Sequence, residues 1–214
     1  MGKQTTGQPY PALAWRWVSE RGVRVATGEA TLACYEVLNS TKFQEIEDII
    51  PADGSLLLIL RRGAAMSSDL QTALALPRDP PPGETGSLHL IPLEYGGAVG
   101  PDLPALAEQA GLGVGDYINS HASAEYTVAF LGFQPGFPYL RGLSPALHAA
   151  RRASPRLRVP AGSVAIGGAY TGIYPTEGPG GWHIIGRTAS VLFDPQRAAP
   201  ALLRVGDRVR FVQA

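Results

Sequence analysis

The sequence has few cysteines and few lysines, and each shortage limits what the protein can do. Its 214 residues include a single cysteine, Cys34, which excludes an intramolecular disulfide and fits a reducing compartment. The only lysines are Lys3 and Lys42. A phosphate-binding loop needs a Gly-Lys-Ser/Thr sequence and Schiff-base chemistry needs a lysine amine, so the C-terminal half has neither.

Net charge and long hydrophobic runs are missing as well. The 18 basic and 18 acidic side chains balance to zero, so the chain lacks the charge that would attract nucleic acid or an anionic membrane. No apolar run approaches the roughly 20 residues of a membrane-spanning helix. The N-terminal residues lack the basic region and apolar core of a signal peptide. We therefore expect a soluble, cytoplasmic protein that binds neither nucleic acid nor membrane.

Metal-binding and nucleophile motifs are not apparent either. The 4 histidines show none of the close spacings of zinc sites and no Cys-x-x-Cys pair exists, so no metal is expected. Ser163 lies in Ala-Gly-Ser-Val-Ala, which is not the Gly-x-Ser-x-Gly sequence of hydrolases. The glycines of residues 111–115 follow a helical pattern rather than a strand, which argues against a dinucleotide loop.

Glycine and proline are abundant in one region. From Gly132 to Gly186 the sequence contains eleven glycines and seven prolines. Aromatic residues are interleaved with them, at Phe133, Phe137, Tyr139, Tyr170, Tyr174 and Trp182. Flexible linkers are poor in aromatic residues, so this region predicts many fixed turns around packed rings. Loops held rigid in this way often shape a pocket or a partner surface.

A proline-rich segment divides the chain. Residues 77–87, PRDPPPGETGS, hold four prolines and two glycines without apolar periodicity, which is typical of a connector. We therefore expect a small α+β domain over residues 1–80, a connector over 81–87 and a second domain over 88–214.

The first part mixes strand and helix patterns. Alternation predicts two strand-like pieces around a turn at residues 20–22, and the apolar run 55–60 predicts a buried strand. Residues 40–46 are expected to begin or continue a helix whose apolar face reaches Ile50. A second helix is expected over residues 67–76.

The second part is dominated by short strands. Helices are expected over residues 102–111, capped by Asp102, and over 116–123. Strands are expected over residues 87–93, 126–131, 163–166, 182–187, 191–193 and 208–212. Short strands separated by Gly/Pro turns indicate a sandwich or a barrel, and the pattern alone does not distinguish the two.

Several motifs of the second part occur together. The most specific is GFQPGFPYL, residues 132–140. The others are Ile91–Gly97, Gly100–Leu103, His121, Tyr126, Pro155-Arg156, Val159–Val164, Ile173–Pro175, Pro179–Trp182, Ile185–Thr188 and Gly206–Phe211. Through these motifs, which extend over residues 88–212, the chain resembles the family of the bacterial 5-oxoprolinase B subunit. That family also includes a sporulation kinase inhibitor and was long labelled allophanate hydrolase subunit 1.

The resemblance implies a fold and a function. The fold is α+β, with a small N-terminal α+β domain followed by a cyclophilin-like β-barrel domain. The function is that of the B subunit in an ATP-dependent 5-oxoprolinase, which opens the lactam 5-oxo-L-proline to L-glutamate. The implied partners are the A subunit and a homologous C subunit, with ATP required by the complex. Because the sequence shows no complete set of catalytic groups, we expect this chain alone to have negligible activity. Two alternatives stay open: a regulatory module that inhibits a histidine kinase, and a carboxyltransferase portion like that of urea carboxylase.

Three residues are candidates for catalysis. His121 has a side chain whose ordinary pKa lies near neutrality and suits acid–base work, although a histidine that closes a helix and bonds a carbonyl gives the same pattern. Arg156 is a candidate for holding a carboxylate or phosphate through two parallel hydrogen bonds. Ser163 is a candidate donor or acceptor in a pocket, with a turn-capping role as the alternative.

Three further residues are candidates for substrate binding. Tyr139 and Trp182 suit a pocket wall with a polar tip, and Arg187 suits the same anion as Arg156 or else a structural ion pair. The remaining assignments are structural: Phe133 and Phe137 in the core, Asp207 in a turn and Arg158 on a solvated face. For Arg151 and Arg152, a solvated basic face and a role beside Arg156 both stay open. We expect His121, Tyr139, Arg156, Ser163 and Trp182 to face one pocket or one subunit junction.

Overall fold

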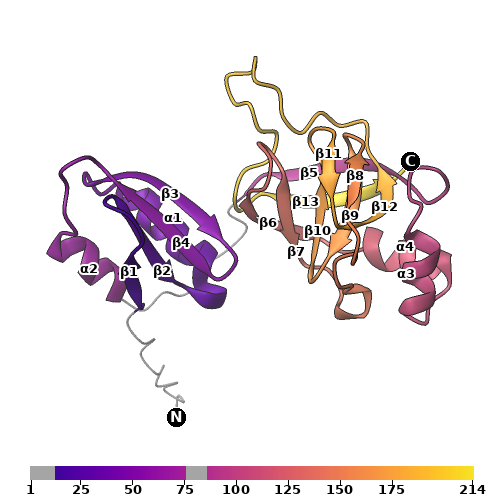
Figure 1. Ribbon diagram of the computed structural model, residues 1–214, viewed down its shortest axis with the longest axis horizontal. Helices are drawn as coiled ribbons and strands as arrows, with labels where there is room; N and C mark the ends of the chain where they lie inside the picture. Colours follow the sequence, from indigo (N-terminus) through magenta and orange to yellow (C-terminus); the bar gives the residue numbers. More distant parts are fainter. Residues whose placement is uncertain (1–12, 76–85) are drawn as a thin grey trace, which may run out of the picture. The chain divides into compact units, whose positions relative to one another are not determined.

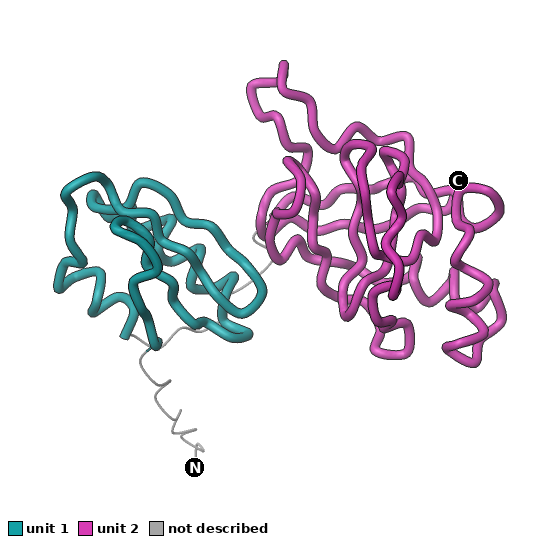
Figure 2. The backbone as a smooth tube through the Cα atoms, viewed as in Figure 1, with its two compact units in different colours: residues 1–84 teal, residues 85–214 magenta. Residues whose placement is uncertain are grey.

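The computed structural model describes residues 13–75 and 86–214. The chain divides into two compact units, residues 1–84 and 85–214 (Figure 2). Of the connector expected over residues 81–87, only Gly86 and Ser87 are among the described residues. None of the described helices is long and apolar enough to cross a membrane.

Unit 1 is a small sheet with two helices (Figure 1). Its antiparallel sheet has the strand order β1-β2-β4-β3. The elements are β1 (Trp15–Trp17), β2 (Gly22–Ala26), α1 (Thr31–Thr41), β3 (Ile46–Ala52), β4 (Ser55–Leu60) and α2 (Ser68–Ala75). Both helices contribute to one core with the sheet, since Leu38 of α1 and Leu70 of α2 cluster with Val23 and Leu58. The strands around the turn at 20–22, the strand at 55–60 and the second helix agree with the sequence pattern.

The helix expected at residues 40–46 is wrong. Helix α1 ends at Thr41, and Lys42 adopts the left-handed conformation with φ 51°. Residues 46–52 form β3 instead, with Ile46 opposite Leu60 and Ile50 opposite Leu57. The spacing of the apolar residues fits a helix face, but the β-branched isoleucines pair with the apolar strand β4, and this pairing decides the structure.

Unit 2 contains a closed barrel (Figure 1). Seven strands follow the order β10-β7-β6-β13-β5-β12-β9, and β9 pairs again with β10. They are β5 (Leu88–Tyr95), β6 (Tyr126–Leu131), β7 (Pro138–Arg141), β9 (Ser163–Gly167), β10 (Tyr170–Ile173), β12 (His183–Arg187) and β13 (Arg208–Gln213). Among the strands in the described part of the chain, only β5 and β13 pair in parallel. The expected α+β fold with a C-terminal barrel is thus confirmed.

Two helices and a small ribbon complete unit 2. Helices α3 (Leu103–Gln109) and α4 (Val114–Ala122) contact each other and pack against β12 and β13 respectively (Figure 1). Strands β8 (Arg156–Val159) and β11 (Gly178–Gly180) form a separate two-stranded sheet. The sequence pattern did not predict β7, β8, β10 or β11. The strand expected at 191–193 is wrong, because this segment makes only an isolated bridge, from Phe193 to Ala201.

Strand β9 is buried on both of its sides, and this decides where the site lies. Val164 and Ile166 belong to the main core, together with Ile91, Val128 and Val209. Ala165, which points to the other side of the strand, belongs to a second cluster with Phe137, Tyr174 and Trp182. The outer side of the barrel at β9 is therefore covered by aromatic residues of the Gly/Pro-rich region.

Candidate functional site

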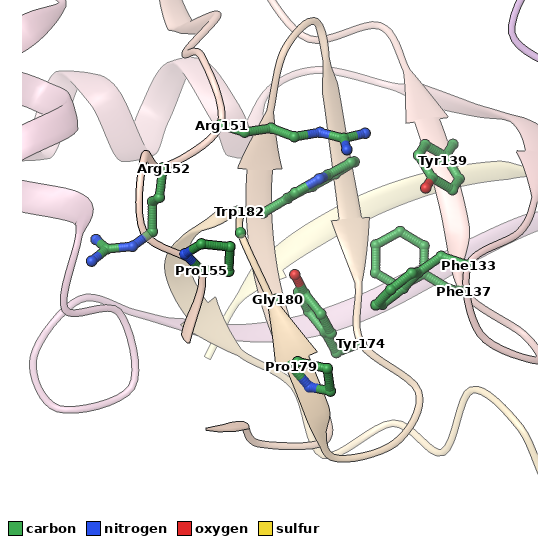
Figure 3. Close-up of a pocket in the computed structure, with 11 residues that line it drawn as sticks. Phe133, Phe137, Tyr139, Arg151, Arg152, Pro155, Tyr174, Pro179, Gly180 and Trp182 are labelled. Carbon is green, nitrogen blue, oxygen red and sulfur yellow. The ribbon is translucent and has the colours of Figure 1, made fainter. Parts of the chain in front are cut away.

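A cavity of ≈ 290 Å³ opens in this aromatic cluster (Figure 3). We call it the aromatic pocket. It is lined by Phe133, Phe137, Tyr139, Arg151, Arg152, Pro155, Tyr174, Pro179, Gly180, Gly181 and Trp182. Its walls are therefore mostly rings, with two arginines as the charged groups, as is usual for small-molecule sites.

Glycines allow the rings to pack this closely. A methyl group at Gly167 would overlap the ring of Trp182, and one at Gly180 would overlap the hydroxyl group of Tyr174. Phe137, Tyr139 and Trp182 then meet at steep ring angles, with ring centroids 5.2–5.5 Å apart. The interleaving of glycine and aromatic residues in the sequence thus has a direct packing cause.

The loop between β6 and β7 presents a strained aromatic side chain. Phe133 has φ 66°, and the N–H of Gln134 donates to the carbonyl of Gly132 at 2.7 Å, which defines a γ-turn of the rare positive-φ kind. The side chain of Phe133 is 60% exposed and meets Phe137 edge to face at 5.5 Å. The expected core position of Phe133 is therefore wrong, whereas that of Phe137 is confirmed. Such strain costs about 1–3 kcal/mol and concentrates at functional sites.

Arg151 extends across the pocket. Its guanidinium lies over the ring of Trp182, 5.9 Å from the centroid, and points to the side of Tyr139 (Figure 3). Burial raises the pKa of Tyr139, and the positive charge of Arg151 offsets part of that rise. Tyr139 therefore keeps its phenol proton at neutral pH and is a hydrogen-bond donor. Arg151 is exposed and also lines the pocket, so the solvated position that the sequence left open is compatible with a place over the pocket.

Behind the pocket, Asp102 binds two arginines. Its Oδ1 accepts from Arg152 at 3.0 Å, and its two oxygens accept from Arg156 in a bidentate pair at 2.8 and 2.9 Å. The N–H of Ile184 donates to Oδ2 at 2.7 Å. Burial would raise the pKa of Asp102, but the hydrogen bonds from Arg156 and Ile184 and the charges of both arginines hold it below its ordinary value.

This arrangement corrects two expectations from the sequence. Asp102 precedes α3 but makes no side-chain hydrogen bond to the helix, because both of its oxygens are occupied by the arginines and Ile184. Arg156 is not available as an anion clamp, since its planar fork already grips Asp102. The ion pairs fix the segment 151–156, and the N–H of Arg152 also donates to the carbonyl of Gly181 at 2.8 Å. Asp102 therefore holds one wall of the pocket in place.

His121 lies inside the barrel rather than in the pocket. It is fully buried at the end of α4, and rings of Tyr126 and Phe211 lie 5.3 and 4.9 Å from it. The hydroxyl of Thr171 donates to the carbonyl of Ala165, so it accepts from Nε2 of His121 at 3.1 Å. Nδ1 therefore accepts from the hydroxyl of Tyr95 at 2.7 Å.

Both ring nitrogens of His121 are satisfied and the ring is neutral. Burial lowers its pKa to about 3, because no charged group in this network compensates the loss of water around an imidazolium. The structure therefore gives His121 the contacts of a core residue, and a role in proton transfer stays a prediction.

The remaining candidates divide between the pocket and other places. Tyr139 and Trp182 come together in the pocket, with centroids 5.4 Å apart. Ser163 is buried at the start of β9, and Arg187 donates from Nε to the carbonyl of Ala161 at 3.0 Å; neither lines the pocket. The expectation that five candidates share one pocket is therefore corrected to Tyr139 and Trp182. Their roles stay predictions.

Two structural assignments from the sequence are confirmed. Arg158 pairs with Glu177 at 2.7 Å, and its side chain is 77% exposed. Asp207 accepts from the N–H of Arg204 at 2.9 Å in the turn before β13. The residues that sequence reasoning missed are Asp102, Arg151 and Tyr174. A signal existed for Tyr174, because it lies among the interleaved glycines and rings, but none existed for the long-range partners of Asp102.

Comparison with known proteins identifies close relatives. The family model of the carboxyltransferase domain, subdomains C and D, matches residues 12–203. The 5-oxoprolinase B subunit of Escherichia coli O157:H7 is 60% identical over 122 residues, which cover 57% of this chain and 56% of that protein. The 5-oxoprolinase B subunit of Bacillus subtilis (strain 168) is 50% identical over 123 residues, or 58% of this chain and 51% of that protein. The matches span about half the length of these relatives.

Solved structures have the same fold. The crystal structure of TTHA0988 matches with a TM-score of 0.75 and 37% identity, over 91% of this chain and 40% of that one. The conserved uncharacterized protein PH0987 from Pyrococcus horikoshii matches with a TM-score of 0.59 and 32% identity, over 94% of this chain and 97% of that one. The K. lactis urea amidolyase matches with a TM-score of 0.71, over 95% of this chain and 15% of that one. At 19% identity, this last likeness concerns the fold alone.

Proposed function

Because the chain belongs to the carboxyltransferase domain family, subdomains C and D, we propose that it serves as the B subunit of an ATP-dependent 5-oxoprolinase. The observation that carries the proposal is the 60% identity to the E. coli O157:H7 protein of that name. In the proposed reaction, water opens the lactam amide of 5-oxo-L-proline to give L-glutamate, while ATP is hydrolysed to ADP and phosphate. The proposed partners are the A subunit and a homologous C subunit, and the proposed location is the cytoplasm.

The aromatic pocket supports this proposal. A lactam ring is small, has apolar faces and carries a polar edge, which matches a cavity of ≈ 290 Å³ with aromatic walls and few polar groups. The pocket is held by fixed turns and by the Asp102 ion pairs, so it is formed before any ligand arrives. Preorganised sites bind small ligands without a large ordering cost.

ATP binding is the part of the proposed reaction for which this chain offers the fewest groups. In residues 13–75 and 86–214, no three His, Cys, Asp or Glu side chains lie close enough together to hold a metal ion on their own. The sequence has two lysines, Lys3 and Lys42, and no phosphate-binding loop. We therefore assign ATP binding to the other members of the proposed complex and lactam binding to this chain.

The chain alone is expected to be inactive. The pocket offers tyrosine hydroxyls and an arginine, but His121 lies inside the barrel with both nitrogens bonded, and Ser163 is buried elsewhere. Among the described residues that line the pocket, no nucleophilic side chain lies beside a side chain that could act as its base. The partner subunits would have to supply the rest of the catalytic groups.

Reconstitution tests this function. The purified chain is mixed with the A and C subunits, ATP and 5-oxoproline, and glutamate is measured; each component is then left out in turn. We expect glutamate only when all are present. Glutamate formation that continues at an unchanged rate without this chain contradicts the proposal, and robust ATP-dependent activity of the chain alone contradicts the division of labour.

A further inference from the structure

We propose that Arg151 binds the carboxylate of 5-oxoproline in the aromatic pocket, with the lactam ring against the aromatic walls. This inference rests on the proposed function, and it assigns substrate recognition to a residue other than the two arginine candidates Arg156 and Arg187.

The first argument concerns which cation is available. Arg152 and Arg156 share the carboxylate of Asp102, and Arg158 pairs with Glu177. Arg151 has no carboxylate partner in the part of the chain that the structure describes, and it lines the pocket. A guanidinium presents five N–H donors in a planar fork that matches a carboxylate. The free positive charge at the pocket therefore belongs to Arg151.

The second argument concerns how Arg151 is held. Its guanidinium lies 5.9 Å above the centroid of Trp182, within the range of a cation–π contact. This contact keeps the long side chain extended across the pocket, with its end on the side of Tyr139 (Figure 3). Trp182 is itself fixed, since only a glycine at position 167 leaves room for its ring. Because Arg151 is exposed, this ring contact removes part of the side-chain entropy that a bound carboxylate would otherwise cost.

The third argument concerns the rest of the ligand. The rings of Phe137, Tyr174 and Trp182 give the pocket apolar walls for the carbon atoms of a five-membered ring. The phenol of Tyr139 stays protonated and offers a donor to a ligand oxygen. A lactam acid has about nine non-hydrogen atoms, which suits a cavity near the lower end of the size range of ligand sites.

Binding measurements with matched ligands test the inference. Calorimetric titration of the full chain compares 5-oxoproline with 2-pyrrolidinone, which has the same lactam ring without the carboxylate, and with inorganic phosphate. We expect 5-oxoproline to bind about ten- to a hundred-fold more tightly than 2-pyrrolidinone, the range for a charge-assisted hydrogen-bonded pair. Equal binding of the two lactams, or stronger binding of phosphate, overturns the inference.

Three variants assign the effect to one side chain. Arg151→Ala should remove the preference for 5-oxoproline, and Arg151→Lys should keep part of it, because the charge stays while the fork is lost. Arg158→Ala removes an equal charge from an exposed position and should leave binding unchanged. An Arg151→Ala protein that binds 5-oxoproline as tightly as the wild type overturns the assignment.

Kinetics of the reconstituted complex separate this inference from the proposed function. In an active complex, Arg151→Ala should raise KM for 5-oxoproline about ten- to a hundred-fold. An active complex whose KM is unchanged overturns the role of Arg151 and leaves the function intact. An inactive complex whose free chain still shows the Arg151-dependent preference overturns the function and leaves the carboxylate site. Absence of binding in the free chain together with an inactive complex overturns both.

Discussion

The two sides of the barrel wall differ in how their polar side chains are placed: on the inner side they are bonded to one another within the core, and on the outer side they lie at an open pocket. On the inner side, Thr171 of β10 and Tyr95 of β5 bind both ring nitrogens of His121; His121 and Thr171 are fully buried and Tyr95 is partly buried. On the outer side, Gly167 and Gly172 leave room for Trp182 and Phe137, and a pocket opens beside them. The histidine, His121, therefore lies in the core, whereas the arginine beside the aromatic rings, Arg151, lies at the surface. Residue type alone would have suggested the reverse.

The largest effect is expected at Asp102, which supports the outer side. Asp102→Ala leaves Arg152 and Arg156 without their carboxylate, so the free energy of unfolding should fall by about 3–5 kcal/mol. Urea denaturation followed by circular dichroism measures this loss. Glu177→Ala breaks the exposed pair with Arg158 and should leave the midpoint nearly unchanged. An equal fall in the free energy of unfolding in the two variants would show that the buried Asp102 ion pairs stabilise the protein no more than an exposed pair does.

The second prediction concerns the inner side and pH. The pKa of His121 is lowered to about 3 in the folded protein, so the unfolded chain binds the extra proton first as pH falls below about 6.5. The contribution of His121 to the free energy of unfolding is therefore fully present above that pH. Below it, the free energy of unfolding should fall by about 1.4 kcal/mol per pH unit down to about pH 3. Urea denaturation between about pH 6.5 and 4.5 measures how the free energy of unfolding changes with pH in the wild type and in His121→Gln, and the wild type should show the steeper fall.

The lowered pKa of Asp102 sets the limit of that pH window. The contribution of ionised Asp102 to the free energy of unfolding is present above its ordinary pKa of about 4 and is lost only below that pH. It therefore does not affect the comparison between about pH 6.5 and 4.5. A wild-type protein whose pH dependence equals that of His121→Gln would show that the imidazole is accessible to protons.

The sequence predicted those features that depend on neighbouring residues. Ser55–Leu60 and Tyr126–Leu131 are strands as expected, because their apolar patterns are local and unambiguous. The helix at residues 40–46 failed because pairing with β4 outweighs the spacing of three apolar residues. The barrel closes through pairs such as β5 with β13, which no local pattern encodes.

The site was predictable only in part, for the same reason. Tyr139 and Trp182 were found because glycines and rings alternate around them in the sequence. The environment of His121 depends on Tyr95 and Thr171, which are 26 and 50 residues away, and that of Arg156 depends on Asp102, 54 residues away. A single sequence does not report such partners, so the two residues were assigned to the wrong surroundings.

A third prediction concerns the fit between glycine and ring. Gly167→Ala places a methyl group against Trp182, so the free energy of unfolding should fall by about 1–3 kcal/mol and ligand binding in the pocket should be lost. Gly115→Ala, in α4 with no atom near the added methyl group, should not destabilise the protein. Thermal denaturation compares the two. Wild-type stability and binding in Gly167→Ala would contradict the packing account.

The smallest effect is expected at Phe133. Phe133→Gly removes the cost of a positive φ in a non-glycine residue, so stability should stay equal or rise by up to about 1 kcal/mol. The side chain is exposed, so little buried surface is lost. At the same time, KM of the reconstituted complex for 5-oxoproline should rise, because this ring lines the pocket. A variant that loses stability and keeps its KM would identify Phe133 as a packing residue.

The central claim is that the aromatic pocket receives the lactam acid, and the three tryptophan indole N–H signals test it most directly. Trp15 and Trp17 lie in unit 1, and Trp182 lines the pocket. Titration of the ¹⁵N-labelled full chain with 5-oxoproline should shift the signal of Trp182 and leave those of Trp15 and Trp17 in place. In Arg151→Ala the shift should require about ten- to a hundred-fold more ligand. A Trp182 signal that stays fixed at 5-oxoproline concentrations that saturate turnover of the complex would contradict the claim.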